Sequence, residues 1–222
     1  MSKSAVLFDI DGTLVDSNYL HVQAWVRAFA ESGLAVDSWR VHRGIGMDSA
    51  QLVSELVGDR MAEKVGERAE ARHSELYLES ASSLRPFDQA RSLLQAVSAR
   101  GIEVLLVTSA GPDELDRLKQ VLDLGDEVAG IVSGDDADTA KPEPDMVEVA
   151  LDRAGVEAGR AVFVGDSIWD VVAAKRVSVP TIGLLSGGTS EAELTEAGAV
   201  KVYADAATLL DGLDGSPIGR MG

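Results

Sequence analysis

Two aspartates separated by one residue follow an apolar segment near the start of the chain. Residues 4–8 form that segment, and Asp9, Asp11 and Gly12 come directly after it. A nearly continuous apolar run is typical of a strand buried on both faces of a parallel sheet, and glycine favours a turn after it. Open α/β sheets bind ligands at the carboxyl ends of their strands. The pattern therefore predicts a site at this strand end.

Alternative roles for the two aspartates have to be weighed. An Asp-x-Asp-Gly string is common in ordinary turns, so alone it leaves a purely structural role open. A calcium-binding helix–loop–helix needs Gly at the sixth loop position and Glu at the twelfth. Counted from Asp9, those positions hold Leu14 and Leu20, which excludes that loop.

Later segments bring more polar groups to predicted strand ends. The predicted strands cover residues 102–108, 129–133 and 161–165. The polar groups that end or follow them are Thr108, Ser109, Lys141, Asp166 and Asp170. Each has an ordinary explanation when met singly, such as turn chemistry or helix capping. Because parallel strands end at one edge of a sheet, we expect all of them to converge with the first two aspartates.

The remaining sequence predicts the elements that position these groups. From residue 86 onward, helical stretches alternate with short apolar strands, which is typical of a parallel sheet wound on both faces. Residues 17–85 show helical apolar spacing without strand alternation. We predict a doubly wound α/β core of residues 1–16 and 86–222, with residues 17–85 inserted as an all-helical cap.

Three further expectations concern packing. The tail from Gly215 onward is predicted to be a frayed terminus. Trp25 and Trp39 are predicted to lie in the interior of the cap. The glycine-rich segment 42–47 is predicted to be a loop between cap helices.

Composition limits the class of protein. The 222 residues include 20 Lys and Arg against 37 Asp and Glu, giving a net charge of -17. Such a surface repels phosphate backbones, so a nucleic acid partner is not expected, and an anionic substrate would need local cations. Cys is absent, which excludes disulfides and thiolate chemistry. No apolar run reaches the roughly 18 residues of a membrane span, and no signal segment is evident. We expect a soluble, cytoplasmic monomer.

Taken together, these segments resemble the haloacid dehalogenase-like phosphohydrolase superfamily. The matching segments are residues 9–17, 141–144 and 165–170. They are most similar to the phosphoglycolate phosphatase and β-phosphoglucomutase branch, whose helical cap follows the first motif, where residues 17–85 lie. Residues 175–178 depart from the pattern at a helix end, where relatives often have Ala-Gly.

The resemblance implies a phosphatase that works through an aspartyl-phosphate. It makes Asp9 the nucleophile and Asp11 the general acid and base. The groups implied to hold the phosphoryl oxygens are Gly12, Thr108, Ser109 and Lys141.

The clustered aspartates predict a bound cation. Like charges about 4 Å apart cost about 4 kcal/mol per pair at an effective dielectric constant near 20. Oxygen ligands suit Mg²⁺ better than zinc. The implied ligands are Asp9, the backbone carbonyl of Asp11 and Asp166, with Asp170 binding the ion directly or supporting its ligands.

Two cap residues are candidates for contacting the substrate. Arg43 lies in the glycine-rich segment 42–47, which resembles the substrate-specificity loop of this branch. His21 follows Asp11 by ten residues, and relatives carry a histidine there that assists acid–base chemistry. Both residues also fit an ordinary surface role.

The leading prediction is a Mg²⁺-dependent phosphatase acting on a small phosphorylated metabolite. The alternative is a β-phosphoglucomutase-like mutase, which returns the phosphoryl group to the substrate. A phospho-receiver module is about half this length and lacks a helical insertion. A non-catalytic phosphate-binding protein is disfavoured because no motif residue is missing. A fold does not name a ligand, so the substrate stays open.

Overall fold

The protein is built around a parallel sheet that carries the predicted site at one edge. The computed structural model describes residues 3–137 and 139–221. In this part of the chain, a six-stranded sheet has the order β3-β2-β1-β4-β5-β6. The strands are β1 (Ala5–Phe8), β2 (Glu103–Val107), β3 (Gly130–Val132), β4 (Ala161–Gly165), β5 (Thr181–Leu184) and β6 (Lys201–Tyr203). Since β1 lies between β2 and β4, the residues after β1 sit near the middle of the carboxyl edge.

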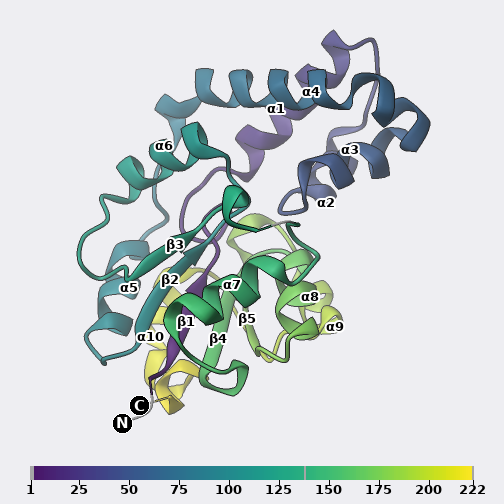
Figure 1. Cartoon of the computed structure of the whole chain (residues 1–222). Coiled ribbons are helices and arrows are strands. Elements are labelled where there is room, and N and C mark those ends of the chain that lie inside the picture. Colours follow the sequence, from purple (N-terminus) through teal and green to yellow (C-terminus); the bar gives the residue numbers. More distant parts are fainter. Residues whose placement is uncertain (1–2, 138, 222) are drawn as a thin grey trace.

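Helices cover both faces of the sheet (Figure 1). They are α5 (Ala90–Ser98), α6 (Pro112–Leu122), α7 (Asp145–Ala154), α8 (Ile168–Arg176), α9 (Glu191–Ala197) and α10 (Ala206–Asp211). Neighbouring residues of one strand point to opposite faces. Accordingly, Leu7 packs in the cluster that contains Met146 of α7, whereas Phe8 packs in the cluster that contains Leu93 of α5. The apolar run of β1 is therefore buried on both sides, as predicted.

A group of helices is inserted between β1 and β2. They are α1 (Asn18–Glu31), α2 (Ser38–Gly44), α3 (Ser49–Val57) and α4 (Asp59–Glu79). Their apolar faces form a cluster of their own, which includes Trp25, Phe29, Val41 and Leu52. Figure 1 shows this helical cap at the end of the molecule away from the chain termini. The cap therefore has a separate apolar interior.

The predicted fold class, a doubly wound parallel sheet with an inserted helical cap, is confirmed. The strand ranges agree to within a residue or so at each end. The helix α2 was not predicted, and it includes the first part of segment 42–47, which is therefore only partly a loop. The domain boundaries at residues 16 and 85 stay a prediction.

Two packing predictions were wrong. Trp39 is 66% exposed, so it is not part of the cap interior, whereas Trp25 is buried as predicted. The tail is not frayed over its described part, because Ile218 is fully buried in the core and begins a short 3₁₀ helix ending at Arg220. Apolar character alone does not tell which side of a short helix faces the interior.

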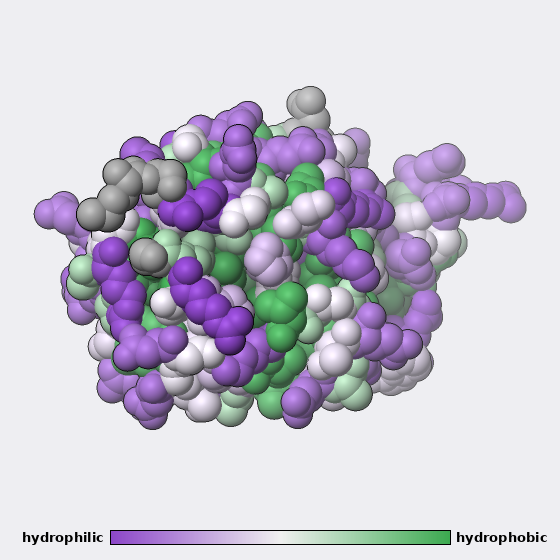
Figure 2. Space-filling view, turned by 90° about the horizontal axis from the view of Figure 1, so that it is seen from below, coloured by the Kyte–Doolittle hydropathy of each residue, from purple (hydrophilic) through white to green (hydrophobic). Residues whose placement is uncertain are grey.

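The outer surface fits the charged composition. Seen from below in Figure 2, hydrophilic side chains cover much of the molecule, and hydrophobic ones form smaller patches between them. Within the described residues, none of the helices combines the length and the apolar character that crossing a membrane requires.

Candidate active site

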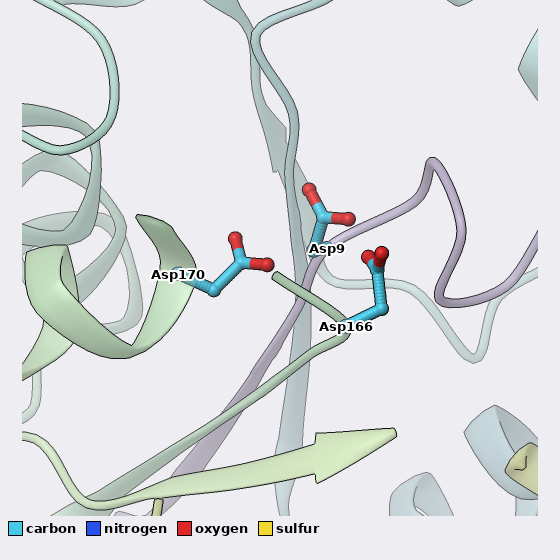
Figure 3. A group of neighbouring side chains, drawn as sticks. All are labelled: Asp9, Asp166 and Asp170. Carbon is cyan, nitrogen blue, oxygen red and sulfur yellow. The ribbon is translucent and has the colours of Figure 1, made fainter. Parts of the chain in front are cut away.

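Three aspartates meet at the carboxyl edge of the sheet. Asp9 follows β1, Asp166 follows β4, and Asp170 lies in the first turn of α8. All three are buried, and one carboxylate oxygen of each lies within 4.8 Å of the others. Figure 3 shows the three side chains around a common space. Asp9 and Asp170 are 161 positions apart in the sequence, and they meet at one edge of the sheet together with Asp166, as predicted.

Lys141 reaches the same place from the loop before α7. Its ammonium nitrogen lies 2.5 Å from Asp9 Oδ1 and 2.8 Å from Asp170 Oδ1, and the side chain is 1% exposed. Burial lowers the pKa of Lys141, but the carboxylates of Asp170 and Asp9 outweigh it and raise the pKa above its ordinary value. Lys141 is therefore a fixed positive charge beside Asp9.

Negative charge still exceeds positive charge in this cluster. Burial raises the pKa of Asp9 well above its ordinary value, with Lys141 opposing and the other aspartates adding to the shift. Burial, followed by the charge of Asp170, raises the pKa of Asp166 to about 7. A further cation would relieve this repulsion.

The donor set suits a hard divalent ion. Carboxylate oxygens are the ligands that such ions prefer. Asn18 donates from Nδ2 to Asp166 Oδ2 at 2.9 Å, while its buried Oδ1 has no hydrogen-bond partner within the described chain. Asp170 is already bound by Lys141 and by the hydroxyl of Ser167 at 2.7 Å. The three aspartates could hold a metal ion.

Thr13 and Asn18 join the aspartates although neither was predicted as a site residue. The Thr13 hydroxyl lies 2.9 Å from Asp166 Oδ1 and 3.2 Å from Asp9 Oδ2, and the residue is fully buried. Thr13 belongs to the first motif, which was the available signal. Asn18 begins α1 and carries no comparable signal.

Gly12 is required where it stands. Its φ is +74°, in the left-handed region. A Cβ atom at this position would lie 2.3 Å from Asn18 Nδ2 and 2.5 Å from Asp166 Oδ2. A side chain would therefore displace the group that binds Asp166.

Asp11 is held by hydrogen bonds from three sides. Ser17 donates to its Oδ1 at 2.6 Å, His21 Nε2 lies 3.3 Å from the same oxygen, and Thr108 donates to Oδ2 at 3.4 Å. Burial raises the pKa of Asp11, but the bonds from His21 and Ser17 leave it below its ordinary value. Asp11 is therefore ionised before substrate binds.

A cavity of about 60 Å³ lies over Asp9 and Asp11. The cap supplies much of its wall, and residues after β2 supply the rest. The wall includes His21, Trp25, Met47, Ser49, His73, Ser109 and Glu114. Ser109 and His21 line this cavity, whereas Arg43 forms an ion pair with Glu193 and lines a separate hollow. The predicted substrate contacts of all three residues stay a prediction.

His73 and Glu114 were missed by the sequence reasoning. His73 Nε2 lies 3.0 Å from His21 Nδ1, and its ring stacks on Trp25 with centroids 4.2 Å apart. Burial, then the neighbouring His21, lower the pKa of His73 well below its ordinary value. Burial lowers the pKa of His21 too, but the hydrogen bond and charge of Asp11 raise it overall. No local motif marks His73 or Glu114.

Comparison with known proteins identifies the family and the enzyme class of the chain. Residues 3–178 match the family described as haloacid dehalogenase-like hydrolase. A phosphoglycolate phosphatase from Rhodospirillum rubrum is 33% identical over 218 residues, covering 94% of this chain and 90% of the relative.

Two solved structures illustrate the range of similar folds. A hydrolase from Pseudomonas syringae is 33% identical, with a TM-score of 0.91 over 96% of this chain and 99% of that one. A β-phosphoglucomutase from Clostridium difficile has a TM-score of 0.81 over 94% of this chain and 93% of that one, but is 17% identical and so shows the fold alone. The predicted enzyme class, a phosphoric monoester hydrolase, is confirmed by the family match and the named relatives. The chain belongs to the haloacid dehalogenase-like hydrolase family.

Proposed function

We propose that this enzyme is a Mg²⁺-dependent phosphatase that hydrolyses a small phosphorylated metabolite through an aspartyl-phosphate on Asp9. The observation that carries the proposal is the position of Asp9, whose carboxylate lies under the cavity, 2.5 Å from the Lys141 ammonium and beside Asp166. A nucleophile flanked by a fixed cation and by metal-binding groups suits attack on a phosphate dianion.

In the first step, a carboxylate oxygen of Asp9 bonds to phosphorus and the bond to the leaving oxygen breaks. Asp11 is ionised in the free site, and the negative charge of an arriving phosphate favours its protonation. It then gives that proton to the leaving oxygen. In the second step, water attacks phosphorus and returns a proton to Asp11, while the bond to Asp9 breaks and phosphate leaves.

Other residues hold and orient the phosphoryl group. Lys141 offers a charge-assisted hydrogen bond to its oxygens, and the Thr108 hydroxyl, now on Asp11, lies close enough to share that role. Asp9 and Asp166 would hold Mg²⁺ with the backbone carbonyl of Asp11, and Asp170 would support them through Lys141. The ion, when bound, neutralises charge on the phosphoryl oxygens.

The cavity favours a small leaving group. An engineered cavity of about 150 Å³ accepts benzene, whereas the cavity above Asp9 measures about 60 Å³, which favours a leaving group smaller than a hexose. The relative at 33% identity is named a phosphatase. Both observations favour a phosphatase over a hexose phosphate mutase.

The test is phosphate release from a panel of small phosphate esters, with Mg²⁺ and with EDTA. We expect release with Mg²⁺, loss of release with EDTA, and its return when Mg²⁺ is added back. Glucose 1-phosphate with a trace of the bisphosphate should give free phosphate at most and no glucose 6-phosphate. Formation of glucose 6-phosphate as the main product would overturn the assignment in favour of the mutase.

A further inference from the structure

The wall of the cavity above Asp9 carries a further buried carboxylate. Glu114 lies in the first turn of α6 and is 8% exposed. Its Oε1 accepts a hydrogen bond from Ser74 of α4 at 2.9 Å. Across the described residues, this is the one hydrogen bond that the structure gives to that carboxylate, and Glu114 lines the cavity. Its second oxygen is therefore available to a ligand.

The positive side chains of the neighbourhood are engaged elsewhere. Within the described residues, the wall of this cavity contains neither lysine nor arginine. Lys141 is held between Asp9 and Asp170. Arg43 pairs with Glu193 and lines the neighbouring hollow. A carboxylate on a leaving group would thus find no ammonium or guanidinium partner in the cavity.

The two histidines do not supply that partner. His21 uses one ring nitrogen on Asp11 and the other on His73. His73 is 5% exposed, and burial and His21 hold its pKa well below the ordinary value, which favours the neutral ring. Burial lowers the pKa of His21, but Asp11 raises it overall, and a positive charge on His21 is paired with the Asp11 carboxylate. Glu114 is therefore a hydrogen-bond acceptor with no unpaired cation beside it among the described residues of the wall.

We propose that the leaving group is a small alcohol with a second hydrogen-bond donor, a hydroxyl or an ammonium group, that bonds to Glu114. A leaving group with a carboxylate in that position is disfavoured, because the two anions would meet without a cation between them. The small cavity favours a leaving group of few non-hydrogen atoms. This inference rests on the proposed phosphatase activity, and it differs from the substrate named for the relative from Rhodospirillum rubrum.

Three esters with the same two-carbon skeleton test the inference: 2-hydroxyethyl phosphate, phosphoethanolamine and 2-phosphoglycolate. With Mg²⁺ present, we expect kcat/KM for at least one of the first two to exceed that for 2-phosphoglycolate by about tenfold or more. Comparing 2-hydroxyethyl phosphate with phosphoethanolamine identifies whether a hydroxyl or an ammonium group is the preferred donor to Glu114. Equal or faster hydrolysis of 2-phosphoglycolate would overturn the inference and leave the phosphatase assignment standing. No phosphate release from any phosphate ester would overturn both.

Two variants test whether the Glu114 side chain causes the preference among these esters. Glu114→Gln keeps the shape of the side chain and removes its charge, so we expect the preference against 2-phosphoglycolate to shrink about tenfold. The matched control is Asp113→Asn, which removes an exposed acid one residue away and should leave the preference unchanged. An unchanged preference in Glu114→Gln, or the same loss in Asp113→Asn, would contradict a role for Glu114. If Glu114→Gln does not fold, the ester series with the unchanged enzyme still decides.

Discussion

The two halves of the site are held together by different forces. In the phosphoryl half, charged groups at strand ends are buried against one another, as with Lys141 between Asp9 and Asp170. In the leaving-group half, aromatic rings stack and polar side chains pair, as with His73 between Trp25 and His21. The first half depends on balanced charge and the second on packing between helices. Disturbing them should therefore have different consequences.

The largest expected effect is on turnover in the phosphoryl half. Asp9→Asn removes the nucleophilic oxygen and keeps the side-chain shape, so we expect kcat to fall by about 10⁴-fold or more. The measurement is phosphate release with Mg²⁺, together with circular dichroism to show that the fold persists. Asp16→Asn is a control, because Asp16 pairs with Arg85 near the surface. A mutant at position 9 with near-normal turnover would remove Asp9 as the nucleophile.

The same contrast explains what the sequence could predict. Asp9, Lys141 and Asp166 lie far apart in the chain, but each belongs to a short motif near a strand end, and parallel topology brings such ends together. His73 and Glu114 come from the middle of one helix and the start of another. Their meeting depends on how the cap packs over the core, which no local pattern of residues encodes.

Trp39 is a residue whose position the sequence predicted wrongly, again because the packing of the cap is not encoded locally. Its apolar ring suggested the cap interior, but the short helix α2 turns it outward and uses Val41 for the interior instead. A seven-residue helix offers too few turns for an apolar periodicity to indicate its buried side.

The second expected effect is on stability in the phosphoryl half. Lys141→Met would leave the buried carboxylates of Asp9 and Asp170 without their cation, so we expect the free energy of unfolding to fall by about 3–5 kcal/mol. Urea denaturation with EDTA present measures it. Adding Asp170→Asn should restore part of the loss by removing one of the unpaired charges. Lys175→Met, at an exposed site, is the control, and an equal loss there would show that charge balance is not the cause.

A smaller effect is expected in the leaving-group half as pH falls. Because the pKa of His73 is well below its ordinary value in the fold, the unfolded chain takes up a proton near pH 6.5 and the folded protein does not. The contribution of His73 to stability is therefore present above that pH and declines below it. The free energy of unfolding should decrease between about pH 7 and 5.5. Replacing His73 with Gln should make that decrease smaller by roughly 1 kcal/mol.

The measurement for His73 is urea denaturation of both proteins across that pH range. The raised pKa of His21 acts in the opposite direction, since its contribution is present at low pH and lost as pH rises. The difference between the two proteins, rather than either curve alone, therefore reports on His73. Parallel curves would show that His73 does not titrate differently in the folded and unfolded states.

The smallest effect is expected where the cap touches the core at the surface, outside both halves of the site. Arg43 of α2 pairs with Glu193 of α9, and both side chains are more than a third exposed. Exposed ion pairs contribute about 0.2–1 kcal/mol and are screened by salt. We expect Arg43→Ala to lower stability by no more than this amount. A double-mutant cycle with Glu193→Ala at low and high salt measures the coupling of the pair, separately from the bonds that Glu193 also accepts from Ser190. Coupling well above that range, or insensitive to salt, would mean that this pair holds the cap against the core far more strongly than an exposed contact should.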